Sequence, residues 1–317
     1  MPVFSHKRCL IDSILLLLLA VCGTGLLLWS EAVSAVMVKT VHLCTQVLLP
    51  SLFPYFVLSS LLISSGIVQR IAPHLERMTQ YLFGLPGSCA AAVLLGAVGG
   101  YPVGAKTAAS LYQQGVCRKE DALTALRFCN NAGPAFLISA VGSGLLGDKR
   151  LGILLYGLHL ISSMLIGLSF RENKDVVKLY NITDKKAPNT SLTSDFLQAV
   201  TGSFSAFLNV CAFVLLFSVI ICLLEQLPLL SRLPPLFQGL LSGVLELTSG
   251  TAALAASPLP KRCLLTVLSF LCGWGGLSVQ LQTISFLQEA DLPYREYLGF
   301  KLLHGGLGAL LTFLLYR

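Results

Sequence analysis

Long apolar runs separated by short polar loops dominate the chain. A helix rises 1.5 Å per residue, so about 20 apolar residues are enough to cross the hydrocarbon core of a bilayer. Runs of about this length lie near residues 10–28, 51–67, 128–146, 151–169, 198–225, 263–288 and 297–316. The pattern therefore predicts an all-α integral membrane protein that crosses the membrane several times.

Two further apolar stretches, 82–113 and 235–257, are interrupted in the middle and do not have the pattern of simple spans. The first contains Gly96-Ala-Val-Gly-Gly-Tyr-Pro-Val-Gly-Ala-Lys106, and the second contains the lone acid Glu246. Backbone groups released by such a break must be buried in protein or line a watery cavity. We therefore expect each stretch to form a re-entrant helical hairpin whose turn contributes to a binding site.

The order of these segments is repeated along the chain. In each half an apolar span is followed by a broken segment and then by a glycine-containing segment, Phe128-Cys-Asn-Asn-Ala-Gly-Pro-Ala-Phe136 in the first and Leu271-Cys-Gly-Trp-Gly-Gly-Leu-Ser278 in the second. Inverted repeats with broken helices are typical of secondary transporters, which bind substrate where the breaks meet. We expect this architecture, and chance similarity between apolar segments is the alternative.

The repeat divides the chain into parts with expected boundaries. We expect an N-terminal helix and connector at 1–40, repeats at 41–170 and 196–317, and a cytoplasmic linker at 171–195. Basic residues favour the cytoplasmic side, and the linker contains the densest group of them, Arg171, Lys174, Lys178, Lys185 and Lys186. With this orientation the hairpin at 82–113 opens to the cytoplasm and the hairpin at 235–257 opens to the opposite side.

The composition supports a membrane location and disfavours nucleic-acid binding. The chain is 55% hydrophobic and only 12% charged, whereas soluble domains are about 25% charged. Its net charge of +7 is spread over the loops, so we expect no nucleic-acid partner. The first apolar run is long for a signal peptide, which favours a retained helix over a cleaved one.

The cysteines and histidines do not indicate enzyme chemistry. Six of the ten cysteines lie within apolar runs, where we expect buried thiols and no disulfides: Cys22, Cys44, Cys129, Cys211, Cys222 and Cys272. The histidines are scattered, with no His-Glu-x-x-His or Cys-x-x-Cys spacing: His6, His42, His74, His159 and His304. We therefore predict no catalytic site, no metal and no cofactor.

The two ionisable residues of the broken segments are the main candidates for substrate chemistry. A lysine in a membrane is costly unless it faces a cavity and finds a partner, so Lys106 is expected to bind an anionic ligand. Alternatively, Lys106 extends to the interface or pairs with Glu246. Glu246 either binds a proton or cation for coupling or neutralises Lys106.

Amides, hydroxyls and a tyrosine complete the predicted substrate site. Asn130 and Asn131 either bind the ligand or cap a helix, and Tyr101 either stacks on an aromatic ligand or anchors at an interface. Ser249 and Thr251 are weaker candidates, because hydroxyls in membrane helices often bond only to their own backbone, and of Gln280 and Gln282 only one is expected to face the site. The predicted substrate-binding residues are Gly100, Tyr101, Pro102, Lys106, Asn130, Asn131, Glu246, Ser249 and Gln280.

The segments Gly-Gly-Tyr-Pro-Val-Gly-Ala-Lys (99–106) and Cys-Asn-Asn-Ala-Gly-Pro-Ala-Phe (129–136) resemble those of sporulation integral membrane proteins with nucleoside-recognition (Gate) domains. The resemblance extends from about residue 40 to the C-terminus. It implies an endospore-forming bacterium and an outline similar to concentrative nucleoside transporters. For the spore-stage-V type it also implies movement of dipicolinate across the outer forespore membrane.

The resemblance also sets the expected substrate and partners. Nucleoside transporters have a carboxylate and amides at the first hairpin tip, where this chain has Tyr101, Pro102 and Lys106, so a small anion such as dipicolinate is preferred to a nucleoside. We expect a transporter or facilitator that works by alternating access. The alternatives are a nucleoside transporter and a non-transporting scaffold for spore-envelope assembly. The expected partners are the lipid bilayer, other sporulation membrane proteins and further copies of the chain.

Overall fold

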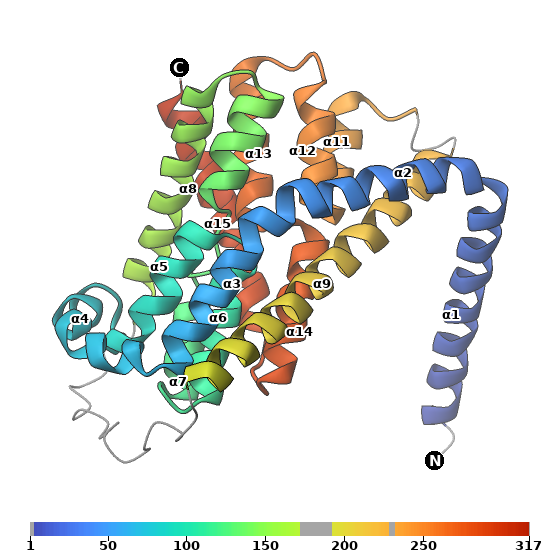
Figure 1. The fold of residues 1–317 in the computed structure, drawn as a ribbon. Helices are drawn as coiled ribbons and strands as arrows, with labels where there is room; N and C mark the ends of the chain where they lie inside the picture. Colours follow the sequence, from blue (N-terminus) through green and yellow to red (C-terminus); the bar gives the residue numbers. More distant parts are fainter. Residues whose placement is uncertain (1–2, 172–191, 228–231, 317) are drawn as a thin grey trace.

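All regular structure in the described residues of the computed structural model, 3–171, 192–227 and 232–316, is helical (Figure 1). The first part contains α1 (Val3–Leu28), α2 (Ser30–Leu43), η1 (Cys44–Leu48), α3 (Leu49–Ser64), α4 (Ile67–Phe83), η2 (Gly87–Cys89), α5 (Ala90–Gly99), α6 (Val103–Gln113), α7 (Lys119–Leu126), η3 (Ala135–Leu145) and α8 (Lys149–Ser169). The remainder contains α9 (Leu192–Glu225), α11 (Pro235–Leu245), α12 (Leu247–Ala255), α13 (Lys261–Trp274), α14 (Gly276–Glu289) and α15 (Arg295–Leu315). Most of the predicted linker, 172–191, lies outside the described residues.

Several helices are long and apolar enough to cross a membrane, as predicted for a multi-pass membrane protein. Within the described residues four qualify: Lys149–Ser169, Thr193–Glu225, Lys261–Glu289 and Arg295–Leu315. Six qualify if two bent pairs are each counted as one span, Leu19–Leu28 with Ser30–Leu48 (bent by 91°) and Leu52–Ser64 with Ile67–Phe83 (bent by 87°). The prediction of a helical integral membrane protein is therefore confirmed.

The predicted span at 128–146 is wrong. Only Ala135–Leu145, an 11-residue π-helix, is helical there, and the chain from Cys129 to Gly133 is irregular. Gly133 and Pro134 explain the break, because glycine weakens a helix and proline lacks the N–H that would continue it. The helix that remains is too short to cross a bilayer by itself.

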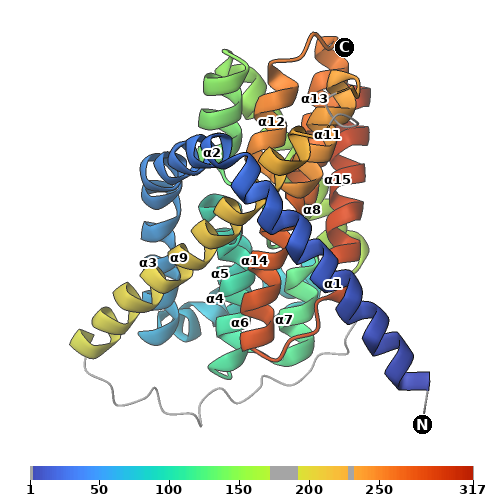
Figure 2. The ribbon, with the colours of Figure 1, turned by 90° about the vertical axis from the view of Figure 1, so that its right-hand side faces the viewer.

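The N-terminal helix α1 extends away from the other helices (Figures 1 and 2). Leucines on more than one side of it are exposed, including Leu16, Leu17, Leu19 and Leu27. Cys22 is exposed as well, which corrects the expectation that it is buried, whereas Cys44, Cys129, Cys211, Cys222 and Cys272 are buried free thiols. Exposed apolar side chains on α1 are consistent with a helix that contacts lipid.

Each interrupted stretch forms a pair of short helices joined by a tight turn. Helices α5 and α6 meet at residues 100–102, and α11 and α12 meet at Glu246. Figure 1 shows the base of the first hairpin at the lower end of the molecule and that of the second at the upper end. The tips of the two hairpins therefore point toward the middle of the molecule from opposite ends.

Glycines allow the two arms of each hairpin to touch along their backbones. A Cβ atom on Gly96 would lie 2.8 Å from the Cα of Gly104 and only 1.8 Å from the carbonyl oxygen of Cys129. In the second hairpin, a Cβ on Gly250 would lie 2.0 Å from the Cα of Gly243. Only glycine fits at these contacts.

Each hairpin tip lies against a break in another helical segment. Gly100 of the first tip lies beside Gly133, where the missing Cβ would come within 3.0 Å of the backbone nitrogen. The second tip lies beside the junction of α13 and α14, where Gly275 and Gly276 have φ of +90° and +79°, a backbone conformation that favours glycine. A Cβ on Gly276 would lie 2.9 Å from the nitrogen of Leu247.

The two predicted halves share their hydrophobic cores. One cluster joins Phe83, Leu111 and Phe128 of the first half to Leu287 and Tyr297 of the second. Another joins residues between 44 and 103 to residues between 206 and 286. The halves therefore pack as one body around the region where tips and breaks meet.

Candidate functional site between the hairpin tips

A cavity of about 90 Å³ lies between the two hairpin tips, beside the first helix break and α14. We call it the central cavity. Its wall includes the first tip, the first break, the second tip, α14, α9 and the segment before α3: Val47, Leu48, Leu52, Gly99, Gly100, Tyr101, Ala132, Gly133, Ala135, Phe136, Val210, Val214, Glu246, Leu247, Thr248, Val279 and Gln282. A mostly apolar wall with a few convergent polar groups is typical of a small-molecule site.

The charged side chain on this wall is Glu246. It is 2% exposed, and its carboxylate accepts hydrogen bonds from the backbone N–H groups of Thr248 (2.9 Å) and Ser249 (2.7 Å). These N–H groups belong to the first turn of α12, whose positive helix end favours a negative charge. Glu246 is therefore stabilised by its own helix and does not pair with Lys106.

Gln282 supplies a free amide to the central cavity. Its Nε2 atom is buried and has no hydrogen-bond partner within the described ranges. A buried donor without a protein partner at a cavity wall is suited to bind a ligand or a water molecule. Gln280 is not on this wall, because its Nε2 donates to the carbonyl oxygen of Trp274 at the helix break. The glutamine that lines the central cavity is thus Gln282 and not Gln280, and a substrate-binding role for either glutamine stays a prediction.

Tyr101 joins the first hairpin tip to α13. Its ring lines the central cavity, and its hydroxyl donates a hydrogen bond of 2.7 Å to the carbonyl oxygen of Cys272. The residue is 9% exposed, so it does not anchor at a membrane interface. Tyr101 therefore lines the central cavity, and its stacking on an aromatic ligand stays a prediction.

Lys301 of α15 is a buried lysine behind Tyr101 that the prediction from sequence missed. It is 1% exposed, and its Nζ donates to the Tyr101 hydroxyl (2.9 Å) and to the carbonyl oxygen of Asn130 (2.8 Å). A lysine in the middle of an apolar run is the signal that could have revealed it, because such residues mark functional positions in membrane proteins. Lys301 connects the first tip and the first break to α15.

Two histidines extend this polar network to α8. Lys301 Nζ lies 3.2 Å from His304 Nδ1, and His304 Nε2 lies 3.0 Å from the carbonyl oxygen of His159. His159 Nε2 accepts a hydrogen bond from the backbone N–H of Ala132, at 2.9 Å. If Nε2 of His304 carries the proton, its Nδ1 accepts from Lys301 and every contact is satisfied. Histidines that are far apart in sequence therefore meet beside the central cavity.

Asn130 and Asn131 hold the first break in place and do not line the cavity. Asn130 Oδ1 accepts from the backbone N–H of Ala105 in the first turn of α6 (3.4 Å), and its Nδ2 donates to Thr283 and Tyr297. This is the helix-capping role, although the helix capped is not the one that follows Asn130 in sequence. Asn131 Nδ2 donates to the carbonyl oxygen of Phe128, and its Oδ1 is buried without a partner in the described part of the chain.

The remaining predicted residues are not all brought together. Gly100 lines the central cavity, and Pro102 is buried beside Tyr101 at the start of α6. Ser249 contributes a backbone N–H to Glu246, while the Thr251 hydroxyl bonds to the backbone of its own helix. Lys106 lies four residues beyond Pro102, with Nζ 4.5 Å from the centre of the Phe56 ring, and lines a different cavity.

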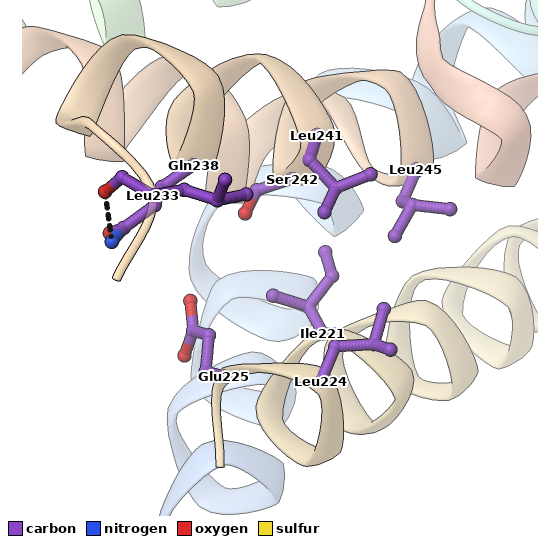
Figure 3. Close-up of a pocket in the computed structure, with 8 residues that line it drawn as sticks. All are labelled: Ile221, Leu224, Glu225, Leu233, Gln238, Leu241, Ser242 and Leu245. Carbon is purple, nitrogen blue, oxygen red and sulfur yellow. Dashed lines mark hydrogen bonds between the residues drawn. The ribbon is translucent and has the colours of Figure 1, made fainter. Parts of the chain in front are cut away.

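A third cavity of about 240 Å³ lies between the C-terminal end of α9 and α11 (Figure 3). Glu225 of α9 and Gln238 of α11 are polar residues on its wall, and Gln238 Nε2 donates to the carbonyl oxygen of Leu233. We call it the Glu225 cavity. Within the described ranges, no three His, Cys, Asp or Glu side chains are placed to hold a metal ion.

Comparisons with known proteins support the resemblance seen in the sequence. A family model described as Gate, nucleoside recognition, matches residues 45–149. The chain is 29% identical over 307 residues to the sporulation integral membrane protein YlbJ of Bacillus subtilis (strain 168), covering 86% of this chain and 74% of that relative. No solved structure matches. The predicted resemblance to sporulation membrane proteins with Gate domains is therefore confirmed.

Proposed function

From a Gate domain and a long similarity to a sporulation integral membrane protein, we propose that this chain is a transporter or facilitator of a small anionic metabolite during spore formation. Dipicolinate is the proposed substrate. The observation that carries the proposal is the central cavity, which lies between the tips of two hairpins based at opposite ends of the molecule. A ligand in such a cavity could be released to either end of the molecule, depending on which hairpin moves.

The proposed mechanism is alternating access between two inverted repeats. Each hairpin separates the central cavity from one end of the molecule, so displacement of one hairpin exposes the cavity to that end only. Paired broken helices that meet at a central site are the architecture of many secondary transporters. The close fit of Gly100 against Gly133, and of Gly276 against Leu247, supports two closed tips that separate as units.

The groups around the central cavity suit a small aromatic carboxylate bound together with a proton or cation. The Tyr101 ring offers a face for stacking, and Gln282 offers a free N–H donor. Lys301 supplies a hydrogen-bond donor behind Tyr101, with its Nζ 4.8 Å from the ring centre. Glu246 would repel a bound carboxylate, and we assign it the proton or cation that accompanies the substrate.

A nucleoside is the second candidate substrate, because the matching family model is described as nucleoside recognition. For either substrate the proposed location is the outer forespore membrane, and the proposed partners are the bilayer and other sporulation membrane proteins. We propose no catalytic role. The non-transporting scaffold is the outcome that the following experiment would favour if transport is absent.

The test is uptake of radiolabelled dipicolinate into proteoliposomes that contain the purified full chain, under several imposed ion gradients. Gln282→Ala should reduce uptake severely, whereas Gln288→Ala, an exposed glutamine on the same helix, should leave it unchanged. Excess unlabelled nucleoside should not compete. Nucleoside uptake without dipicolinate uptake would favour the second candidate. No uptake of either compound by folded protein would overturn transport and favour the scaffold.

A further inference from the structure

The cavity lined by Lys106 has a volume of about 200 Å³ and lies between α6, α9 and α14. We call it the Lys106 vestibule. Its wall carries one ammonium, one carboxylate, and several amides and hydroxyls: Lys106, Ala109, Ser110, Gln113, Gly202, Ser205, Ala206, Asn209, Phe286 and Glu289. Residues on its wall such as Ser205 and Gln113 are exposed, so it is accessible from outside the helical body.

The vestibule and the central cavity are neighbours along two helices. Ala206 lines the vestibule and Val210 the central cavity, while on α14 Phe286 lines the vestibule and Gln282 the central cavity. Each pair is four residues apart, so it is separated by about 6 Å along its helix. Val103, Val210 and Phe286 belong to one buried apolar cluster. A short apolar constriction therefore separates the two cavities.

Lys106 is the cation at the inner part of the vestibule. Its ammonium lies over the Phe56 ring, and no ion pair found among the described residues includes it. A cation–π contact compensates a partly buried charge only in part. Glu289 lies at the exposed rim, where its backbone oxygen accepts a hydrogen bond from Gln113 Nε2. The ammonium is thus available to an anion that enters past this rim.

We infer that the Lys106 vestibule is a second binding site, at which a small organic carboxylate is held before it passes the constriction to the central cavity. Lys106 binds the carboxylate, and Glu289 at the rim opposes its approach. The inference rests on the proposed transport function and adds a site to it. It assigns to Lys106 a contact with the ligand that is separate from the contacts made in the central cavity.

Opposite charge changes in the vestibule give the first test, with dipicolinate as the probe in the proteoliposome assay. Lys106→Gln should raise the KM for uptake roughly tenfold, the size of one charge-assisted hydrogen bond, and leave the maximal rate unchanged. Lys106→Arg should behave as wild type, and Glu289→Gln should lower the KM. Lys119→Gln, which removes a lysine that bonds to Asp291 outside the vestibule, should change neither constant.

A second test measures binding without transport. In the full chain bearing Ser205→Cys, dipicolinate should slow the reaction of the introduced thiol with a charged thiol reagent, read by mass spectrometry of the peptide that contains it. Addition of Lys106→Gln should remove this protection, and addition of Lys119→Gln should preserve it. Because the readout is independent of transport, protection in a protein that shows no uptake would support the vestibule and overturn the proposed function.

Three results would overturn the vestibule site. One is uptake by wild type with a KM that is unchanged in Lys106→Gln, which would leave the proposed transport intact. Another is a lower maximal rate in Lys106→Gln with an unchanged KM, the pattern expected if Lys106 only supports the fold. The third is labelling of the Ser205→Cys variant that dipicolinate does not slow.

Discussion

The two hairpin tips have the same arrangement of helices but are held in place in different ways. The first tip has no charged residue and is fixed by groups from elsewhere: the Cys272 carbonyl and Lys301 bind Tyr101, and Asn130 caps α6. The second tip carries Glu246, which binds the first turn of its own helix. The first hairpin tip therefore depends on several groups of α13, α15 and the first break, whereas the second depends mainly on its own Glu246 and receives one side-chain hydrogen bond from α13, from Trp274 Nε1 to the Val244 carbonyl oxygen.

A difference of this kind assigns different roles to the tips. A tip that is held by several remote side chains must break several hydrogen bonds to move, and a tip that satisfies its own backbone keeps its hydrogen bonds as it moves. We therefore expect the second hairpin to be the more mobile one. The following changes separate the two tips, beginning with the largest expected effect.

Lys301→Met should have the largest effect on stability. It leaves the Asn130 carbonyl oxygen and His304 Nδ1 buried without their donor, at a cost of about 1–3 kcal/mol each, and it removes the donor to the Tyr101 hydroxyl, which keeps its bond to Cys272. The midpoint of thermal unfolding in detergent should fall by several degrees, and uptake should be lost. Lys119→Met is the matched surface control. An unchanged midpoint would contradict the view that Lys301 holds the first tip.

Glu246→Gln should reduce uptake much more than stability. The amide retains one oxygen that accepts from the first turn of α12 but lacks the charge that the helix end favours, at a cost of about 1 kcal/mol. If Glu246 carries the coupled proton or cation, gradient-driven uptake should fall to the level without a gradient. Glu296→Gln, an exposed glutamate at the start of α15, is the control. Full gradient-driven uptake in Glu246→Gln would exclude this coupling role.

Tyr101→Phe should have an intermediate effect on the first tip. It removes the hydrogen bond to Cys272 and one acceptor of Lys301, which together are worth about 1–2 kcal/mol, and it keeps the ring that lines the cavity. We expect a lower free energy of unfolding, measured by denaturant titration in detergent, with substrate selectivity retained. Tyr81→Phe, at an exposed tyrosine, should change neither. Selectivity lost at unchanged stability would mean that the hydroxyl contacts the substrate.

Amide hydrogen exchange should show the smallest difference and requires no substitution. Peptides that cover α11 and α12 should exchange about tenfold faster than those that cover α5 and α6, because opening the second tip breaks one hydrogen bond from another element, from Trp274 Nε1 to the Val244 carbonyl oxygen, whereas opening the first tip breaks several. Lys301→Met should bring the two hairpins closer in rate by accelerating the first. Equal exchange rates of the two hairpins in the wild type would contradict the expectation that the second hairpin is more mobile than the first.

The hairpins were predictable from sequence because their signals are local. Glycine and proline around residues 96–104, and a lone acid at Glu246 within an apolar stretch, mark a broken backbone whatever surrounds it. The span at 128–146 was mispredicted although Gly133 and Pro134 lie within it, because hydropathy registers side-chain polarity and not the loss of helical hydrogen bonds. A local rule applied to every Gly-Pro pair would have placed this break.

The polar network was not predictable, because its members come from distant parts of the chain. His159, Lys301 and His304 lie on α8 and α15, and nothing in their spacing shows that they face the same tip. Lys106 was assigned to the site because it is close to the tip in sequence. One helical turn displaces it from the tip by about 6 Å, and the apolar cluster around Val103 separates it from the central cavity. Lys106 is thus close to the first tip in sequence but does not line the same cavity.

The contact between Gly243 and Gly250 has a mechanical consequence. At this contact no side chain lies between the arms to change rotamer and absorb a displacement, so we expect the part of the second hairpin near the tip to move as a rigid unit. A displacement of its exposed base near Pro258 would therefore also displace Glu246 at the tip. Binding of a lipid or a protein at that base would therefore change the access to a cavity that it does not touch.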